Sequence, residues 1–215
     1  MAGLISVDNG TLLVYLHSGV SATISSSFAA PESTTSDGAS MDGTGSLLLN
    51  CNNSKLYKMV GVSSTINNSF NHGRDGTDIS LSPAGNLLVA DYIVDKVWVF
   101  SGISATVVDS FAVVDTTING ITVDFSGNLI STGHITDRIY IHSGIGATIT
   151  SSFTANSDEP RGLALDTAGN LLSVSSWTLV RIRTHAGITA TITTSFTPPG
   201  SAPRGITMDA EGGGC

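Results

Sequence analysis

The sequence predicts an all-β fold, and more narrowly a five-bladed β-propeller whose blades are four-stranded antiparallel sheets. Three observations lead to this prediction. One motif of about forty residues recurs along the chain. Within each copy, short apolar runs alternate with turns rich in Gly and Asn. Finally, the two ends of the chain hold complementary parts of the motif.

The clearest copy of the motif covers residues 120–153. Its expected strands are residues 121–124, 129–133, 138–142 and 147–153, short alternating segments separated by turn residues. Four such strands form a sheet that is apolar on both faces. Because one sheet cannot bury both faces alone, the copies must stack against one another.

The register of the repeat is held at several positions at once. The copies start at spacings of 40, 42, 42 and 43 residues, at Gly38, Asp78, Gly120, Gly162 and Gly205. A phenylalanine closes every copy, at Phe28, Phe70, Phe111, Phe153 and Phe196. Agreement at two positions so far apart within the motif indicates a repeat architecture.

The ends of the chain predict a closed ring. Residues 3–7 align with residues 128–132, so the chain starts at a second strand, whereas residues 205–209 align with residues 120–124, a first strand. A linear solenoid needs capping repeats, while complementary ends suit a ring in which the C-terminal strand joins the N-terminal blade. We expect one domain, residues 1–215, with these blades: 3–37 plus 205–213, 38–77, 78–119, 120–161 and 162–204.

Composition limits the partners. Nine basic and seventeen acidic residues give a formal charge of −8, and this acidic balance argues against a nucleic-acid partner. No long apolar run is present, so we expect no membrane partner. The N-terminal residues show no secretory signal, which makes a cytoplasmic protein the default expectation. Cys51 and Cys215 suggest no disulfide framework, and we expect a monomer.

Several segments carry a family resemblance. Residues 79–91 read ISLSPAGNLLVAD and residues 95–100 read DKVWVF, while residues 160–166 and 203–209 read PRGLALD and PRGITMD. This pattern resembles the NHL repeat, a β-propeller repeat. The resemblance implies the fold. It leaves activity open, because the family includes protein-binding and RNA-binding modules and, among wider relatives, metal-dependent lactonases and lyases.

The chain departs from the NHL pattern in three ways. It has five predicted blades where six are usual, and it repeats a Ser-Gly-Ile-x-Ala-Thr segment that is peculiar to it. The aspartate that ends the second strand is kept only at Asp8 and Asp91. The fold therefore carries over from the resemblance better than any activity does.

One face of the predicted ring varies from blade to blade. It carries the connections from the second to the third strands and from the fourth to the first strands, and we call it the variable face; the opposite, constant face carries the turns between first and second strands. Sequence divergence that is confined to one face of a repeat protein is typical of a binding surface. It is also found where loops are solvated and their residues can change without consequence. The candidate ligand-binding residues there are Asp37, Thr77, Asn119, Arg161, Arg204, Asp91, Tyr92, His134 and Trp177.

Arg161 and Arg204 are the pair of candidates that suggests the most specific ligand. Lying in adjacent blades, they could present two planar donor groups to a carboxylate, a sulfate or an acidic sugar. The structural alternative is that they pair with Asp158, Glu159 or Asp37. Tyr92 and Trp177 could supply apolar platforms for a sugar ring, or pack between blades.

The remaining chemistry is sparse. His17, His142 and His185 share a repeat position that holds Met59 and Phe100 in other blades, which indicates a packing role, so His72 and His134 are the histidines of interest. No motif of a known catalytic site is present. We expect no catalytic residue, no metal and no cofactor.

These observations predict a non-enzymatic binding or scaffolding propeller. Its partner would be a protein, a glycan or a small polar ligand, bound on the variable face around the central channel. Two alternatives stay open: a metal-dependent, lactonase-like hydrolase or lyase with its site in the channel, and a structural component of a viral or filamentous assembly.

Overall fold

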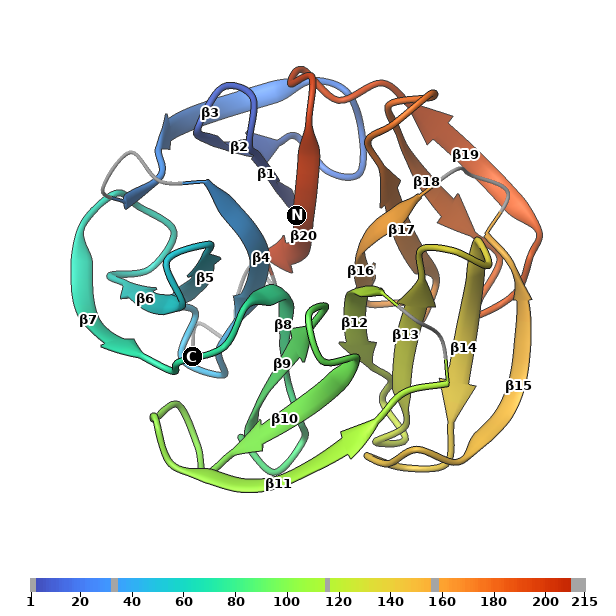
Figure 1. Cartoon of the computed structure of the whole chain (residues 1–215). Helices are drawn as coiled ribbons and strands as arrows, with labels where there is room; N and C mark the ends of the chain where they lie inside the picture. The colour runs from blue at the N-terminus through green and yellow to red at the C-terminus, as the bar shows by residue number, and fades with distance from the viewer. Residues whose placement is uncertain (1–2, 32–34, 115–116, 156–158, 210–215) are drawn as a thin grey trace.

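The computed structural model describes residues 3–31, 35–114, 117–155 and 159–209. They form five four-stranded antiparallel sheets arranged in a ring (Figure 1), which confirms the predicted fold class. Blade 1 contains β20 (Pro203–Asp209), β1 (Gly3–Asp8), β2 (Leu13–His17) and β3 (Ile24–Ala29). No helix in these residues is long and apolar enough to cross a membrane.

The other four blades follow the chain in order. Blade 2 contains β4 (Ser36–Met41), β5 (Leu47–Cys51), β6 (Lys55–Met59) and β7 (Ile66–Asn71). Blade 3 contains β8 (Gly76–Leu81), β9 (Leu87–Asp91), β10 (Lys96–Phe100) and β11 (Val107–Ala112). Blade 4 contains β12 (Ile118–Val123), β13 (Leu129–Gly133), β14 (Arg138–His142) and β15 (Ile149–Thr154). Blade 5 contains β16 (Pro160–Leu165), β17 (Leu171–Ser175), β18 (Arg181–His185) and β19 (Ile192–Phe196).

The ring closes where the two ends of the chain meet. Strand β20 pairs antiparallel with β1, with Gly3 opposite Asp209 and Ser6 opposite Ile206. Strand β20 also packs against the innermost strands β4 and β16 of the neighbouring blades. The predicted closure by the C-terminal strand is therefore confirmed.

The innermost strands begin earlier than the sequence predicts. In blade 4 the first strand was expected at residues 121–124 and is Ile118–Val123, and the fourth was expected at 147–153 and is Ile149–Thr154. The second and third strands match the prediction. The first strand is longer because it continues past a β-bulge, so that Ile118 still pairs with Gly133.

The core lies between the blades, because both faces of each second strand are covered. All five residues of β9 are buried. Leu88 packs with Ile121 of blade 4, and the next residue, Val89, packs with Leu48 of blade 2. This alternation follows from the two-residue period of a strand and explains why the repeats must stack.

Three histidines lie in this core, each beside a serine of the second strand. Ring Nε2 and serine Oγ are 2.8, 2.8 and 3.0 Å apart in the pairs His17 with Ser6, His142 with Ser131 and His185 with Ser173. The same two positions are apolar elsewhere: Met59 with Leu49 in blade 2 and Phe100 with Val89 in blade 3. Burial lowers the pKa of all three histidines, which supports the packing role predicted for this position.

Candidate functional site: a blind cavity on the variable face

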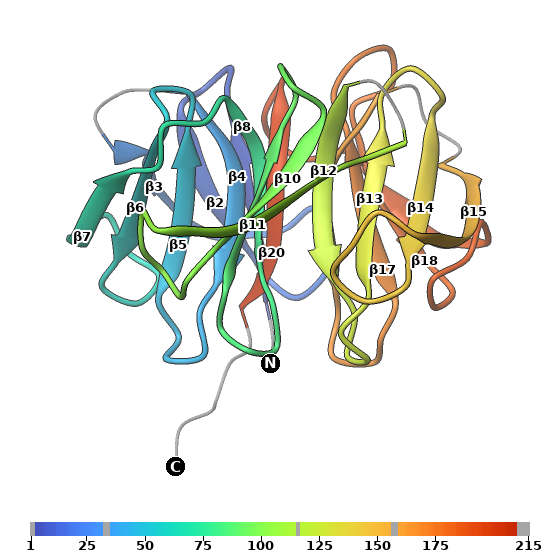
Figure 2. The same cartoon turned by 60° about the horizontal axis from the view of Figure 1, so that its bottom comes forward.

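A cavity with a volume of about 530 Å³ opens on the variable face. Figure 2 shows the ring from the side, with β20 running down to the lower, constant face. Every blade contributes to the walls. The lining residues are Asn9, Thr35, Asp37, Asn52, Asp75, Gly76, Thr77, Tyr92, Thr117, Asn119, His134, Arg161 and Arg204.

The β-bulges of the innermost strands place five of these side chains. In β16, Pro160 pairs with Ser175 and Gly162 pairs with Val174, so that Arg161 is the extra residue. The register of all five innermost strands shifts at the equivalent position. The residues at or within these shifts that line the cavity are Asp37, Thr77, Asn119, Arg161 and Arg204. A bulge re-aims its side chain, which here means toward the ring axis.

Seven of the nine predicted site residues line this cavity; Asp91 and Trp177 do not. Asp91 is buried inside its own blade, where its carboxylate accepts a hydrogen bond from Trp98 Nε1 at 3.1 Å. Trp177 is 68% exposed and lies in the connection after β17. None of the last residues of the second strands lines the cavity, whereas Tyr92 and His134, one residue further on, do.

Lining residues outside the predicted set are Asn9, Thr35, Asn52, Asp75, Gly76 and Thr117. Asn9 and Asn52 occupy the same repeat position as Tyr92 and His134. This shared position is the sequence feature from which they could have been assigned to the site. The others precede or begin the innermost strands. His72 is absent from the lining: it is buried, with Nε2 2.7 Å from Asn50 Oδ1.

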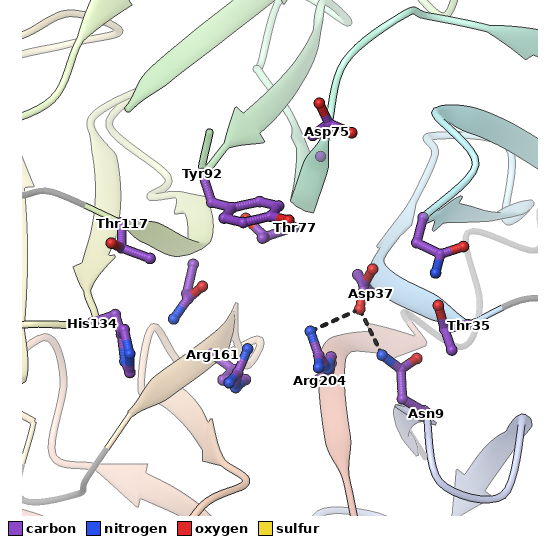
Figure 3. Close-up of a pocket in the computed structure, with 13 residues that line it drawn as sticks. Asn9, Thr35, Asp37, Asp75, Thr77, Tyr92, Thr117, His134, Arg161 and Arg204 are labelled. Carbon is purple, nitrogen blue, oxygen red and sulfur yellow. Dashed lines mark hydrogen bonds and ion pairs between the residues drawn. The ribbon is translucent and has the colours of Figure 1, made fainter. Parts of the chain in front are cut away.

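One charged cluster on the wall joins blades 1 and 2. Arg204 Nη1 lies 3.1 Å from Asp37 Oδ1, and the Asn9 amide donates to the same oxygen at 2.6 Å (Figure 3). Burial raises the pKa of Asp37, while Arg204, Asn9 and Arg161 act in the opposite direction. Burial also lowers the pKa of Arg204.

A second cluster joins blades 4 and 5. Arg161 Nη2 donates to Glu159 Oε2 at 2.6 Å, and His134 Nε2 lies 3.4 Å from Glu159 Oε1. Both arginines thus have the acidic neighbours that the structural alternative anticipated, Glu159 and Asp37. The third suggested neighbour, Asp158, lies outside the described residues.

Ion pairing leaves several polar atoms of the wall unused. Among the described residues, five buried side-chain atoms of the lining have no hydrogen-bond partner: the donors Arg161 Nε, Arg204 Nε and Asn119 Nδ2, the acceptor Asn9 Oδ1, and His134 Nδ1, whose role depends on its tautomer. Asn119 is only 4% exposed. A buried donor without a partner costs about 1–3 kcal/mol. The wall therefore holds unsatisfied donors in three successive blades.

Asp78, the first residue of its repeat, lies below this cavity: the preceding residue, Thr77, lines it, whereas the following one, Ile79, lines a second cavity toward the constant face. The Asp78 carboxylate accepts the backbone N–H groups of Ile79 and Ile121, each at 2.9 Å. Backbone N–H groups of Leu163 and Ala39 also interact with it, so four innermost strands converge on one side chain. Burial raises the pKa of Asp78 well above its usual range, and these N–H groups oppose that shift.

Glycines at the positions equivalent to Asp78 make room for this arrangement. A Cβ atom added to Gly120 would clash with the carbonyl oxygen of Arg161, and one added to Gly162 would clash with that of Arg204. The second cavity lies toward the constant face. It is lined by the residues that come directly after these repeat positions, among them Ala39, Ile121 and Leu163. The site is therefore a blind cavity, and the departure from glycine at Asp78 was the signal that could have revealed its floor.

A metal centre has little support from the described side chains. Among residues 3–31, 35–114, 117–155 and 159–209, no group of three or more His, Cys, Asp and Glu side chains is placed to hold a metal ion. The metal-dependent hydrolase or lyase alternative is not favoured.

Comparison with known proteins places the chain by its fold. No protein-family model matches the sequence, so the NHL resemblance has no confirmation, and no curated protein sequence matches it. A chain in the crystal structure of a nidogen/laminin complex is similar with a TM-score of 0.67 and 15% identity, over 97% of this chain and 98% of that one.

Two further solved structures are similar. Glutaminyl cyclase from Myxococcus xanthus gives a TM-score of 0.61 at 12% identity, over 82% of this chain and 71% of that one. A protein of unknown function from Bacteroides caccae gives 0.58 at 12% identity, over 91% and 73%. At these identities the likeness shows a β-propeller fold, and this fold is consistent with a binding or scaffolding role.

Proposed function

We propose that this protein is a non-enzymatic binding module that holds a protein partner on the variable face. The observation that carries the proposal is the blind cavity itself: equivalent positions of a repeated scaffold vary between blades and converge on one polar pocket. One similar structure is an enzyme and another is part of a two-protein complex. The fold alone therefore does not choose the function, and the site must.

The rim of the cavity favours a protein over a glycan. Tyr92, Ile93 and Val94 follow β9, Ile135 follows β13, and Trp177 and Leu179 follow β17; all six side chains are exposed. We call these six residues the apolar rim. Sugar rings pack on aromatic faces, and four of the six side chains are aliphatic. Exposed aliphatic and aromatic side chains beside a polar pocket are typical of protein interfaces.

A peptide selection tests this proposal. Peptides from a random displayed library would be selected on the wild-type protein, synthesised, and measured by calorimetry. We expect selected peptides to lose most of their affinity when Ile93 and Ile135 are both changed to Asp, and to keep it in Phe125→Ser. Phe125 is 74% exposed and follows β12, at the turn on the constant face, so it is a matched control. Equal loss in the control, or no selectable peptide, would contradict the proposal.

A further inference from the structure

The unsatisfied donors of the cavity wall are grouped on one side. Asn119, Arg161 and Arg204 belong to β12, β16 and β20, which are successive innermost strands of the ring. Each keeps a buried nitrogen without a partner among the described residues. Figure 3 shows Arg161 and Arg204 next to each other on the cavity wall, with the Tyr92 ring on the opposite side. A group that satisfies these nitrogens must supply hydrogen-bond acceptors to this side of the cavity.

The acidic lining residues belong to the other two blades. Asp37 lies in β4 of blade 2, where its carboxylate pairs with Arg204, and Asp75 immediately precedes β8 of blade 3. The cavity therefore has a donor side, formed by blades 4, 5 and 1, and an acceptor side, formed by blades 2 and 3. A ligand with one negatively charged end and hydrogen-bond donors further along its length would match both sides.

The apolar rim restricts the ligand further. Its residues follow the second strands of blades 3, 4 and 5, and Asn119 and Arg161 belong to blades 4 and 5. A negatively charged group that reaches these donors from outside would therefore be followed by apolar contacts at the rim. Peptide chains carry such a group at their C-terminus, where the carboxylate has two oxygens and the preceding residues bring backbone N–H donors.

From this arrangement we infer that the cavity binds the C-terminal carboxylate of a peptide or protein chain, with Asn119, Arg161 and Arg204 as its donors. The apolar side chains that precede the carboxylate pack on the apolar rim. Planar guanidinium groups suit a carboxylate because they can donate two parallel hydrogen bonds. The inference rests on the proposed function and specifies which end of the partner enters the site.

Two libraries test the inference separately from the proposed function. Synthetic peptides with four random C-terminal residues would be prepared as free acids and as C-terminal amides, and screened against the folded full-length chain by fluorescence anisotropy. Selected free acids are expected to bind about 10- to 100-fold more tightly than their amides, because amidation removes the charge that strengthens each hydrogen bond. This comparison needs no variant of the protein.

Variants then assign the donors. Asn119→Leu with Arg161→Met is expected to remove the preference for the free acid, and Arg161→Lys is expected to reduce it, with circular dichroism confirming that each variant is folded. Equal affinity for acids and amides would overturn the inference while the proposed function stands. A preference retained in the folded double variant would also overturn it. If no peptide of either library binds, the proposed function fails and the inference with it.

Discussion

The carboxylate of Asp78 in blade 3 accepts the backbone N–H of Ile121 in blade 4, with Oδ2 and N 2.9 Å apart. Its other oxygen accepts the N–H of Ile79 at the same distance. One side chain thus joins neighbouring blades at the axis of the ring and separates the cavity on the variable face from the one on the constant face.

Asp78→Asn should destabilise the protein by about 2 kcal/mol, since an amide presents one acceptor oxygen where two are needed and leaves a buried N–H facing an NH₂ group. Urea denaturation followed by circular dichroism measures the change. Asp109→Asn on the exposed strand β11 is the control and should be nearly neutral. If both variants unfold at the wild-type urea concentration, Asp78 does not hold the blades together.

Removal of strand β20 should open the ring. A chain that ends at residue 202 leaves the edge of β1 unpaired. It also lacks Ile206, so that Leu4 and the buried side chains of blade 5 that pack with Ile206 lose part of their cover. An exposed strand edge pairs with other chains. Light scattering and thermal melting are expected to show aggregation and a lower melting temperature. A truncated chain that stays monomeric with an unchanged melting temperature would contradict ring closure as a source of stability.

Acid should destabilise the fold through its buried histidines. Burial lowers the pKa of His17, His142 and His185, and burial together with Arg74 lowers that of His72 to about 4. The unfolded chain, with histidine pKa values of about 6.5, binds more protons, so stability is complete above pH 6.5 and falls as the pH drops toward 4. For His72 alone, the loss between pH 7.5 and pH 5 is about 2 kcal/mol.

Urea midpoints measured at several pH values check this dependence. The matched variant is His142→Met with Ser131→Leu, which installs the apolar pair of blade 2 and should weaken the pH dependence. A wild-type stability that is flat between pH 7.5 and pH 5 would show that the histidines are not held neutral in the core.

The Arg204 and Asp37 side chains should show coupled effects on stability. The pair lies at the cavity wall, where the arginine side chain is 33% exposed and solvent screens the interaction, so a coupling energy of about 1 kcal/mol is expected. A double-mutant cycle of Arg204→Gln and Asp37→Asn measures it. Additive effects of the two substitutions would mean that the contact does not contribute to folding.

Most of the fold could be predicted because the repeat, its stacking and its broken ends all follow from residue pattern. The β-bulges could not be predicted, because an extra residue in a strand does not change the repeat by which the strands are recognised. The sequence therefore places the bulged residues just before the innermost strands, whereas these strands begin earlier and include them. Asp91 and Trp177 were assigned to the site from their order in the chain. Asp91 is instead hydrogen-bonded to Trp98 of its own blade, and Trp177 is exposed outside the cavity. Residue pattern does not specify which way such side chains point.

The proposed partner occupies the cavity on the variable face. Its position can be mapped by nuclear magnetic resonance of the ¹⁵N-labelled protein titrated with a selected free-acid peptide. We expect the largest shifts at the backbone amides of Tyr92, Asn119, His134 and Arg161, with little change at Phe125 and Gly127 of the constant face. Shifts centred on the constant face or on the outer strands, with the cavity residues unmoved, would show that the partner binds elsewhere.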